Sequence, residues 1–377
     1  MKRLLLILIL ALPCVQALCC TTAIVSAGAS RTGRPMIWKQ RDGDVYTCVA
    51  HVRGPKYAYT GLFLTVDTLY RKAYAGVNEA GFAIANNLSY NVRPDSVKTG
   101  PENGAFMTEA LGLCATLADF EQLLAEKEAP RDLSANFAVI DACGGAAYFE
   151  VSDDTVVRYD VPEGGFLYRT NYSLSGDEER RVGLVRYMTI ERMMQRRAPR
   201  KFDAPFFFHC SRDFVNVLTG GNALRFRYSG YIYDRDFIPR ASTSSAVVIE
   251  GVAPGERADS GLMWCIPGYP PCSYAVPVWV AAGEQLPSII TGMAPANQHA
   301  EFMRSMLGDI NLDSGYLKVK PLRWNIKLSG RFERREYRAG RRLDRAMRRK
   351  GIDQEAVKAY NAAADARFND YQYIFKI

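Results

Sequence analysis

The sequence contains little histidine, and that scarcity argues against two common kinds of catalytic site. Only His51, His209 and His299 occur among 377 residues, and they lie far apart in the chain. No His/Cys spacing typical of a metal site is present, so neither a metal nor another cofactor is expected. A Ser-His-Asp hydrolase is poorly supported, because no G-x-S-x-G segment places a serine on a strand-to-helix turn.

Other segments that would define a function class are also missing. No glycine-rich phosphate loop opens a helix, since GGAAYFE at residues 144–150 does not lead into a helical pattern. After the leader, no run reaches about 18 apolar residues, so no membrane span is expected. No repeat or low-complexity linker is visible, and one domain is the simpler interpretation.

The first residues are typical of a secretory leader. A positively charged start precedes an apolar run at residues 4–12 that is too short to span a bilayer. Residues 1–19 are therefore predicted to be a signal peptide, and the protein is expected to be exported to a periplasm or the extracellular space. Small residues at the −3 and −1 positions permit two cuts, one before Leu18 and one before Cys20.

Nine cysteines in an exported chain raise the questions of lipid anchoring and disulfides. Lipoprotein anchoring is disfavoured, because Gly, Ala or Ser normally precedes a lipidated cysteine, whereas Pro13, Leu18 or Cys19 precedes the candidates here. Cys265 and Cys272 are close enough in sequence to pair. Buried free thiols are nevertheless the favoured state for most of the set.

The positive charge of the protein is concentrated near its C-terminus. The net charge is +8, and the arginine-rich segment 331–350 carries much of it, interrupted by acidic residues. A charge run of mixed sign is most often a solvated helical face, so no nucleic-acid partner is expected. Residues 331–377 are predicted to form a basic helical segment packed on the main domain, residues 20–330.

Strand patterns dominate the first part of the mature chain, and helical patterns follow. Runs of strand-forming residues alternate with turn formers, which predicts a meandering sheet. Strands first, then helices, then strands again favour stacked layers over alternating βαβ units. The predicted strands include 21–28, 35–41, 48–52, 59–66 and 81–90, and the predicted helices are 107–127 with a cap at Thr116, 178–196, and a polar pair over 341–368.

A cysteine at the mature N-terminus would provide catalysis without histidine. A free α-amino group has a pKa of about 7.7–8.0 in model peptides, so it can accept the proton of its own thiol. A cut before Cys20 creates such a residue. Arg41 is expected to favour the neutral amine and the thiolate, and Asp44 to orient the amine.

The order of these residues resembles a known family. Residues 20–44, CTTAIVSAGASRTGRPMIWKQRDGD, are similar to the opening of the N-terminal-nucleophile (Ntn) cysteine hydrolases, which include choloylglycine hydrolases, penicillin V acylases and isopenicillin N acyltransferases. In that superfamily a Cys-Thr pair begins the mature chain, and an Arg-x-x-Asp follows one hairpin later. Cys20-Thr21 and the segment from Arg41 to Asp44 match these elements.

Three later segments extend the resemblance. GVNEAGFAIANN is similar to the family segment that leads to an asparagine at the oxyanion site, and strand spacing favours Asn86 over Asn87. LYRTNY resembles the Thr-Asn element of the family and assigns Asn171. IPRASTSSAVVIEGV is similar to the region that carries a further arginine, here Arg240, while residues 263–283 fit the acyltransferase-like branch better than the bile salt branch.

The resemblance implies a fold and an activity. The implied fold is α+β, a four-layer αββα sandwich in a single domain with the helical basic extension. The implied activity is hydrolysis of a linear, non-peptide C–N bond in a small-molecule N-acyl amide. The implied site comprises Cys20 as nucleophile, Asn86 and Asn171 as oxyanion donors, and Arg41, Asp44 and Arg240.

Two other hypotheses stay open at this point. The same acyl-enzyme would serve an acyltransferase that passes the acyl group to an amine. A secreted or lipid-anchored binding protein would keep the fold without catalysis. Assembly into a homo-oligomer also stays open, because it rests on analogy with the fold alone.

Overall fold

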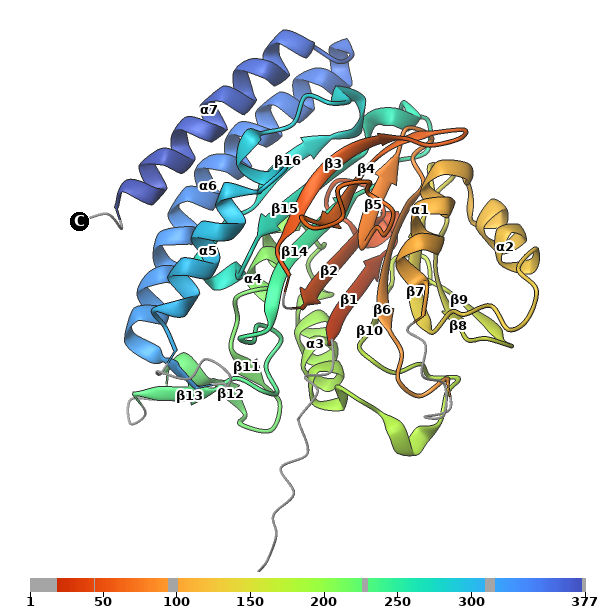
Figure 1. The fold of residues 1–377 in the computed structure, drawn as a ribbon, viewed down its shortest axis with the longest axis horizontal. Helices are drawn as coiled ribbons and strands as arrows, with labels where there is room; N and C mark the ends of the chain where they lie inside the picture. The colour runs from red at the N-terminus through yellow and green to blue at the C-terminus, as the bar shows by residue number, and fades with distance from the viewer. Residues whose placement is uncertain (1–18, 44, 94–100, 226–229, 309–315, 375–377) are drawn as a thin grey trace, which may run out of the picture.

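The computed structural model describes residues 19–43, 45–93, 101–225, 230–308 and 316–374. Two antiparallel β-sheets lie face to face at its centre, and helices cover the outer side of each sheet (Figure 1). The layer order is helix, sheet, sheet, helix. This confirms the α+β class and the four-layer αββα sandwich expected from the sequence.

The first sheet holds the beginning of the described chain in its interior. β1 (Cys20–Val25) and β2 (Met36–Asp42) form a hairpin whose register places Cys20 opposite Arg41. The strand order of this six-stranded sheet is β10-β1-β2-β14-β15-β16. Its other strands are β10 (Phe166–Arg169), β14 (Thr243–Glu250), β15 (Leu262–Pro267) and β16 (Val276–Trp279).

The second sheet is the meander that the strand pattern predicts. Its seven strands pair in chain order from β3 to β9. Two short strand pairs lie outside the two sheets: β11 (Val215–Asn216) with β12 (Gly221–Asn222), and β13 (Tyr231–Tyr233) with β17 (Tyr316–Lys318). The seven strands are β3 (Thr47–Arg53), β4 (Ala58–Leu64), β5 (Ala75–Asn78), β6 (Ala83–Leu88), β7 (Ala135–Ile140), β8 (Ala146–Val151) and β9 (Val156–Asp160).

Side-chain alternation gives the β1–β2 hairpin an inner and an outer face. Ile24 belongs to the core between the sheets, whereas Ala23 and Val25 pack under the outer helices. Alternate residues of a strand point to the same side. The inner face therefore turns from apolar to polar toward the Cys20 end, with Thr22 and Cys20 in β1 and Lys39 and Arg41 in β2.

Helices complete the two outer layers. α1 and α2 pack on the seven-stranded sheet, while α3, α4, α6 and α7 pack on the six-stranded sheet. Thr116 caps α2 as expected, because its hydroxyl accepts the Asp119 N–H while the Asp119 carboxylate accepts the Thr116 N–H. Among the described residues, no helix has the length and apolarity needed to cross a membrane. The helices are α1 (Asn103–Leu113), α2 (Leu117–Ala125), α3 (Leu184–Arg197), α4 (Ala204–Cys210), α5 (Pro295–Ser305), α6 (Val319–Lys350) and α7 (Gln354–Tyr373).

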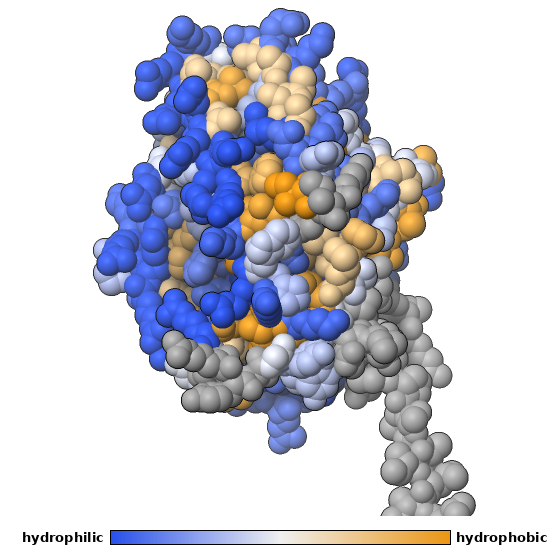
Figure 2. All heavy atoms as spheres, turned by 90° about the vertical axis from the view of Figure 1, so that its left-hand side faces the viewer, coloured by the Kyte–Doolittle hydropathy of each residue, from blue (hydrophilic) through white to orange (hydrophobic). Residues whose placement is uncertain are grey.

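The basic segment 331–350 forms the later part of α6, so the boundary placed at residue 330 falls inside one helix. Figure 2 views the molecule from the left-hand side of Figure 1, where hydrophilic residues predominate. The other side of α6 is buried: Arg341 is ion-paired with Glu250 of β14, and Glu336 with Arg367 of α7. The expectation of a solvated face holds for one side only, because these charges find partners on other elements.

Two glycines of α6 provide a matched test of this packing. A Cβ atom at Gly340 would lie 2.8 Å from Pro277 Cγ and 3.0 Å from the Trp264 ring, whereas one at Gly330 would meet nothing closer than 3.6 Å. Replacing glycine by alanine inside a helix gains up to about 1 kcal/mol, and overpacking costs about 1–3 kcal/mol. We therefore expect Gly330→Ala to raise the free energy of unfolding and Gly340→Ala to lower it by about 1 kcal/mol in urea denaturation. Equal stabilisation by both variants would contradict the close packing of α6 on β15 and β16.

Candidate active site

Cys20 is fixed by contacts on both sides of its backbone. Its N–H donates to Asn171 Oδ1 at 2.8 Å, and its carbonyl accepts from Arg186 Nη1 at 2.7 Å. Arg186, on α3, also donates to Asn171 Oδ1 at 2.9 Å and to the Thr21 hydroxyl. Cys20 is 8% exposed, at the polar end of the inner face. Asn171 and Arg186 therefore hold the start of β1 in one position.

Arg41 lies across the hairpin from Cys20, as the sequence predicts. Its guanidinium stacks 4.4 Å from the centre of the Tyr74 ring and donates to the Ser244 hydroxyl of β14. The side chain is buried, and its Nε atom has no hydrogen-bond partner among the described residues. A fixed positive charge therefore stands beside the Cys20 end of β1.

Lys39, two residues before Arg41, is fully buried and is not among the site residues predicted from the sequence. Its Nζ donates to Asn86 Oδ1 at 2.7 Å and to the Tyr74 carbonyl at 2.9 Å. Burial lowers the pKa of Lys39 to about 8; interaction with Cys20 acts in the opposite direction, and Arg41 lowers it further. The chain therefore keeps a second buried cation near Cys20.

The two adjacent asparagines of β6 have different environments. Asn87 uses both ends of its amide: Oδ1 accepts from the Thr22 hydroxyl, and Nδ2 donates to the Arg169 carbonyl. Asn86 uses Oδ1 to accept from Lys39, and its Nδ2 makes no hydrogen bond to the described residues. Asn86 is thus the member of the pair with an amide donor left for a ligand.

Asn171 contacts Cys20 through the nitrogen of that residue. Besides accepting from Cys20 and Arg186, it donates from Nδ2 to the Leu88 carbonyl at 2.9 Å. These contacts suit a side chain that orients the Cys20 nitrogen. They do not show the oxyanion contact expected from the family resemblance, so that role of Asn171 stays a prediction.

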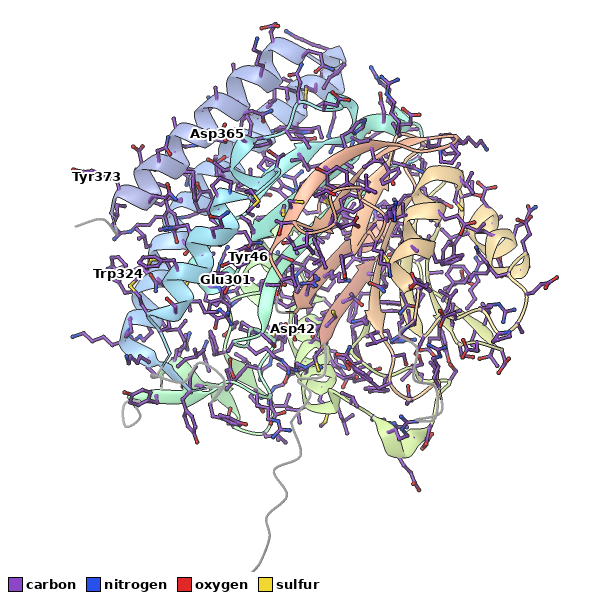
Figure 3. The ribbon with its side chains drawn as sticks, viewed as in Figure 1. Asp42, Tyr46, Glu301, Trp324, Asp365 and Tyr373 are labelled. Carbon is purple, nitrogen blue, oxygen red and sulfur yellow. The ribbon has the colours of Figure 1, made fainter. Side chains whose placement is uncertain are left out.

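Arg240 lies beside the end of β2, in an ion pair with Asp42. Figure 3 labels Asp42 at the end of β2. Arg240 Nε is 3.2 Å from Asp42 Oδ2, and Asp42 Oδ1 accepts from the Thr243 hydroxyl at 2.6 Å. Burial raises the pKa of Asp42, against the opposing charges of Arg240 and Arg186. Asp44, the acid named from the sequence, lies outside the described residues.

Cys19, the residue before Cys20, is buried among the same charges. Burial raises the pKa of its thiol, while Arg186 and Arg240 act in the opposite direction. The pKa of Arg240 is raised by Asp42 first and by Cys19 next, against the effect of burial. In the chain that retains residue 19, Cys19 therefore occupies space beside both arginines.

The structure thus brings together Cys20, Arg41, Asn86, Asn171 and Arg240, and adds Lys39, Asp42 and Arg186 to them. Two of the added residues had a signal in the sequence. Lys39 is a lysine within the apolar strand predicted over 35–41, and Asp42 lies in the segment from Arg41 to Asp44. Arg186 had no such signal, because it lies on a helix 166 residues from Cys20.

The described residues include neither a cluster that would bind a metal ion nor a disulfide bond. They contain no cluster of three or more His, Cys, Asp or Glu side chains that would hold a metal ion. The described cysteines are all free, and Cys265 and Cys272 are buried without a bond between them. The preference for free thiols is confirmed for this pair.

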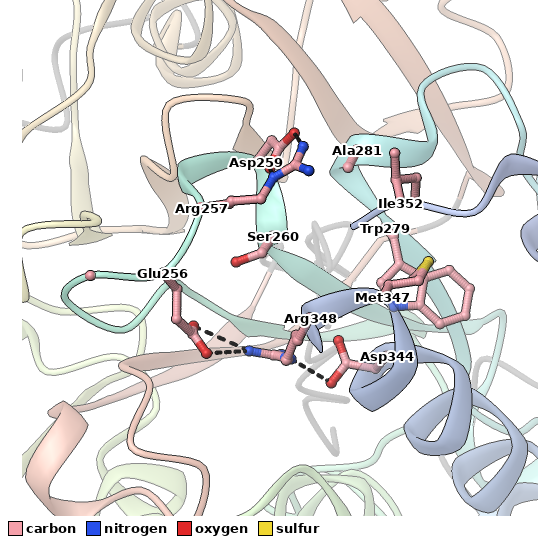
Figure 4. A pocket seen from close by; sticks show the side chains of 11 residues that line it. Glu256, Arg257, Asp259, Ser260, Trp279, Ala281, Asp344, Met347, Arg348 and Ile352 are labelled. Atoms are coloured by element: carbon pink, nitrogen blue, oxygen red, sulfur yellow. Dashed lines mark hydrogen bonds and ion pairs between the residues drawn. The ribbon is translucent and has the colours of Figure 1, made fainter. Parts of the chain in front are cut away.

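Figure 4 shows a separate pocket of about 270 Å³. Its lining includes Glu256 and Ser260, which follow the Glu250 end of β14, whereas Asp42 pairs with Thr243 at the other end of that strand. Glu256, Arg348 and Asp344 form a chain of ion pairs along one side, and Trp279 and Met347 contribute apolar surface. The eight residues of β14 separate the two regions by roughly 25 Å. This pocket therefore does not belong to the Cys20 site.

Comparisons with known proteins find similarity in structure alone. No protein-family model matches the chain, and no curated protein matches it. An N-acylethanolamine-hydrolyzing acid amidase ortholog from Caenorhabditis elegans is 14% identical with a TM-score of 0.42, covering 60% of this chain and 91% of that one. A mutant of the conjugated bile acid hydrolase from Clostridium perfringens is 12% identical with a TM-score of 0.41, covering 69% and 92%. Penicillin V acylase from Agrobacterium tumefaciens is 14% identical with a TM-score of 0.36, covering 68% and 86%.

Asp234 provides a test of the electrostatics next to Arg240. Burial raises the pKa of Asp234 from 3.8 to about 7, although the Ala241 N–H and Arg240 act in the opposite direction. Between pH 3.8 and about 7, the Asp234 carboxyl is protonated in the folded chain and ionised in the unfolded chain. The contribution of this proton to the free energy of unfolding is therefore lost as the pH rises toward 7.

We expect the free energy of unfolding of the unmodified protein to fall relative to Asp234→Asn by about 2 kcal/mol between pH 5 and pH 8. The asparagine keeps an acceptor for the Ala241 N–H but does not titrate. Chemical denaturation of both proteins at each pH provides the measurement. Parallel pH dependences for the two proteins would show that Asp234 is not held protonated by burial.

Proposed function

We propose that this protein is an exported amidase that hydrolyses a linear, non-peptide C–N bond in a small-molecule N-acyl amide, with Cys20 as its N-terminal nucleophile. The observation that carries the proposal is the contact of the Cys20 nitrogen with Asn171 Oδ1, beside the buried charge of Arg41. A cysteine that opens an inner strand, with its nitrogen held and cations beside it, has the parts of a single-residue nucleophile and base.

Removal of residues 1–19 creates the base. The Cys20 nitrogen then changes from an amide to an α-amino group, with a pKa of about 7.7–8.0 in model peptides. Asn171 Oδ1 accepts a hydrogen from either form of this nitrogen. Loss of Cys19 also clears the space beside Arg186 and Arg240. Export and activation would therefore result from the same cleavage.

The reaction follows from these groups in two steps. The neutral amine takes the thiol proton, the thiolate sulfur bonds to the acyl carbon, and the C–N bond breaks as the amine returns the proton to the leaving nitrogen. The amine next takes a proton from water, whose oxygen attacks the thioester and releases the acid as the proton returns to sulfur. Arg41, opposite Cys20 in the hairpin, favours the thiolate by its charge.

Asn86 is the donor best placed to stabilise the oxyanion. Its Nδ2 group is unused among the described residues, whereas the Asn87 amide is bonded at both ends. Arg186 and Asn171 hold the backbone and nitrogen of Cys20. Arg240, which is ion-paired with Asp42 and interacts with Cys19, would meet the substrate once residue 19 is removed.

The nucleophile is tested by Cys20→Ala with Cys143→Ser as the control. Cys143 is an exposed free thiol outside the site. Against a panel of N-acyl amides, including bile salt conjugates, penicillin V and N-acyl amino acids, we expect Cys20→Ala to lose turnover to the background rate. Cys143→Ser is expected to retain it. Full amidase turnover by Cys20→Ala would refute the mechanism.

The oxyanion donor is tested by comparing Asn86→Ala with Asn87→Ala. Loss of one oxyanion donor lowers kcat about 100- to 1,000-fold, so Asn86→Ala is expected to show that loss. It also removes the acceptor of the buried Lys39 ammonium, so a lower unfolding midpoint is expected beside the loss of kcat. Asn87→Ala leaves the Thr22 and Arg169 groups without a partner, and its main effect is expected on thermal stability. The reverse pattern would assign the donor to Asn87.

A further inference from the structure

Lys39 is an unusual cation for the interior of a sandwich. It is fully buried on the inner face of β2, and it forms no ion pair with a carboxylate of the described residues. A buried charge is normally paired, because removing an ammonium from water is costly. Besides its two hydrogen bonds, Lys39 interacts with the Cys20 thiol, the Arg41 guanidinium and the Tyr74 ring. Retention of an unpaired cation beside the nucleophile calls for a reason other than stability.

The contacts of Lys39 join the two sheets at the site. Lys39 belongs to β2 of the six-stranded sheet, whereas Asn86 belongs to β6 of the other sheet and Tyr74 directly precedes β5. Nζ is 2.7 Å from the Asn86 side chain and 2.9 Å from the Tyr74 carbonyl. Because both sheets contribute, the ammonium fixes Asn86 relative to the strand opposite Cys20.

The chemistry of an ammonium decides which end of the Asn86 amide faces it. An ammonium has donors and no acceptor, so the neighbouring group must be the amide oxygen. A flipped amide would direct Nδ2 hydrogens at the positive charge and lose the bond. Lys39 thus selects the rotamer in which Nδ2 points away from Nζ, and no described residue accepts from that Nδ2.

We propose that Lys39 is a positioning residue for the amidase reaction, holding Asn86 so that its Nδ2 donates to the oxyanion formed at Cys20. This inference rests on the proposed function and names a residue required for its site. Lys39 touches neither substrate nor acyl carbon in this scheme. Its effect on the rate passes through Asn86, which distinguishes it from a cation that acts on the thiolate by charge alone.

The test is a double-mutant cycle with Lys39→Met and Asn86→Ala. Methionine keeps the length and apolar stem of lysine and removes the donors and the charge. We expect Lys39→Met to lower kcat about 10- to 100-fold, less than the full loss of an oxyanion donor, with KM changed less than about 3-fold. In the Asn86→Ala background the same change is expected to cost less than about 3-fold, because coupled residues are not additive.

Lys39→Gln separates hydrogen bonding from charge. Glutamine removes the positive charge but retains an amide donor for Asn86 Oδ1, so kcat is expected to lie between those of the unmodified enzyme and Lys39→Met. Equal losses for Lys39→Gln and Lys39→Met, or a full effect of Lys39→Met in the Asn86→Ala background, would overturn the proposal in favour of a direct charge effect.

Trp38→Phe is the matched control. Trp38 is adjacent on β2, faces the outer helices and donates from Nε1 to the Ser211 hydroxyl. The Trp38→Phe variant is expected to leave kcat unchanged. If Lys39→Met fails to fold, Lys39→Gln and its cycle with Asn86→Ala provide the same comparison. A general structural role would lower stability in every variant and leave no kcat-specific coupling.

Cys20→Ala in the same assay distinguishes failure of the proposed role of Lys39 from failure of the amidase proposal. Loss of turnover in Cys20→Ala together with full kcat in Lys39→Met would overturn the role of Lys39 and leave the amidase proposal intact. Retained turnover in Cys20→Ala would overturn both, because the oxyanion at Cys20 would not exist.

Discussion

The site depends on the register of the β1–β2 hairpin. That register places Cys20 opposite Arg41 and Thr22 opposite Lys39, so the nucleophile and both neighbouring cations share the inner face of one sheet. A slip of one residue would move the whole set to the outer face. Apolar residues on both faces, such as Ile24 inside and Ala23 outside, oppose such a slip. The packing of the core thereby fixes the geometry of the chemistry.

Positive charge exceeds negative charge around Cys20. Lys39, Arg41, Arg186 and Arg240 are buried or nearly buried there, and Asp42 is the described carboxylate that pairs with one of them. Such surroundings favour a thiolate and a neutral amine, the two forms that the proposed mechanism needs. They also make the site costly to assemble. The hydrogen bonds to Asn86, Asn171 and Ser244 offset part of that cost.

Local features of the fold and of the site could be predicted from the sequence, whereas contacts between distant segments could not. The strand that opens at Cys20, the hairpin to Arg41 and the Thr116 cap depend on neighbouring residues, and the structure shows each of them. Arg186 reaches Cys20 only because α3 packs on the six-stranded sheet, which no local pattern reveals. The difference between Asn86 and Asn87 likewise comes from Lys39 and Thr22 on the opposite sheet. Arg341 was assigned to a solvated face because its partner, Glu250, lies 91 residues away.

The most direct test of the account is mass spectrometry of the N-terminal peptide of the exported, active protein. We predict a chain that begins at Cys20 with an unmodified α-amino group, since that nitrogen serves as the base. A fully active protein that begins at Leu18 or Cys19, or that carries an acyl group on the Cys20 nitrogen, would contradict it.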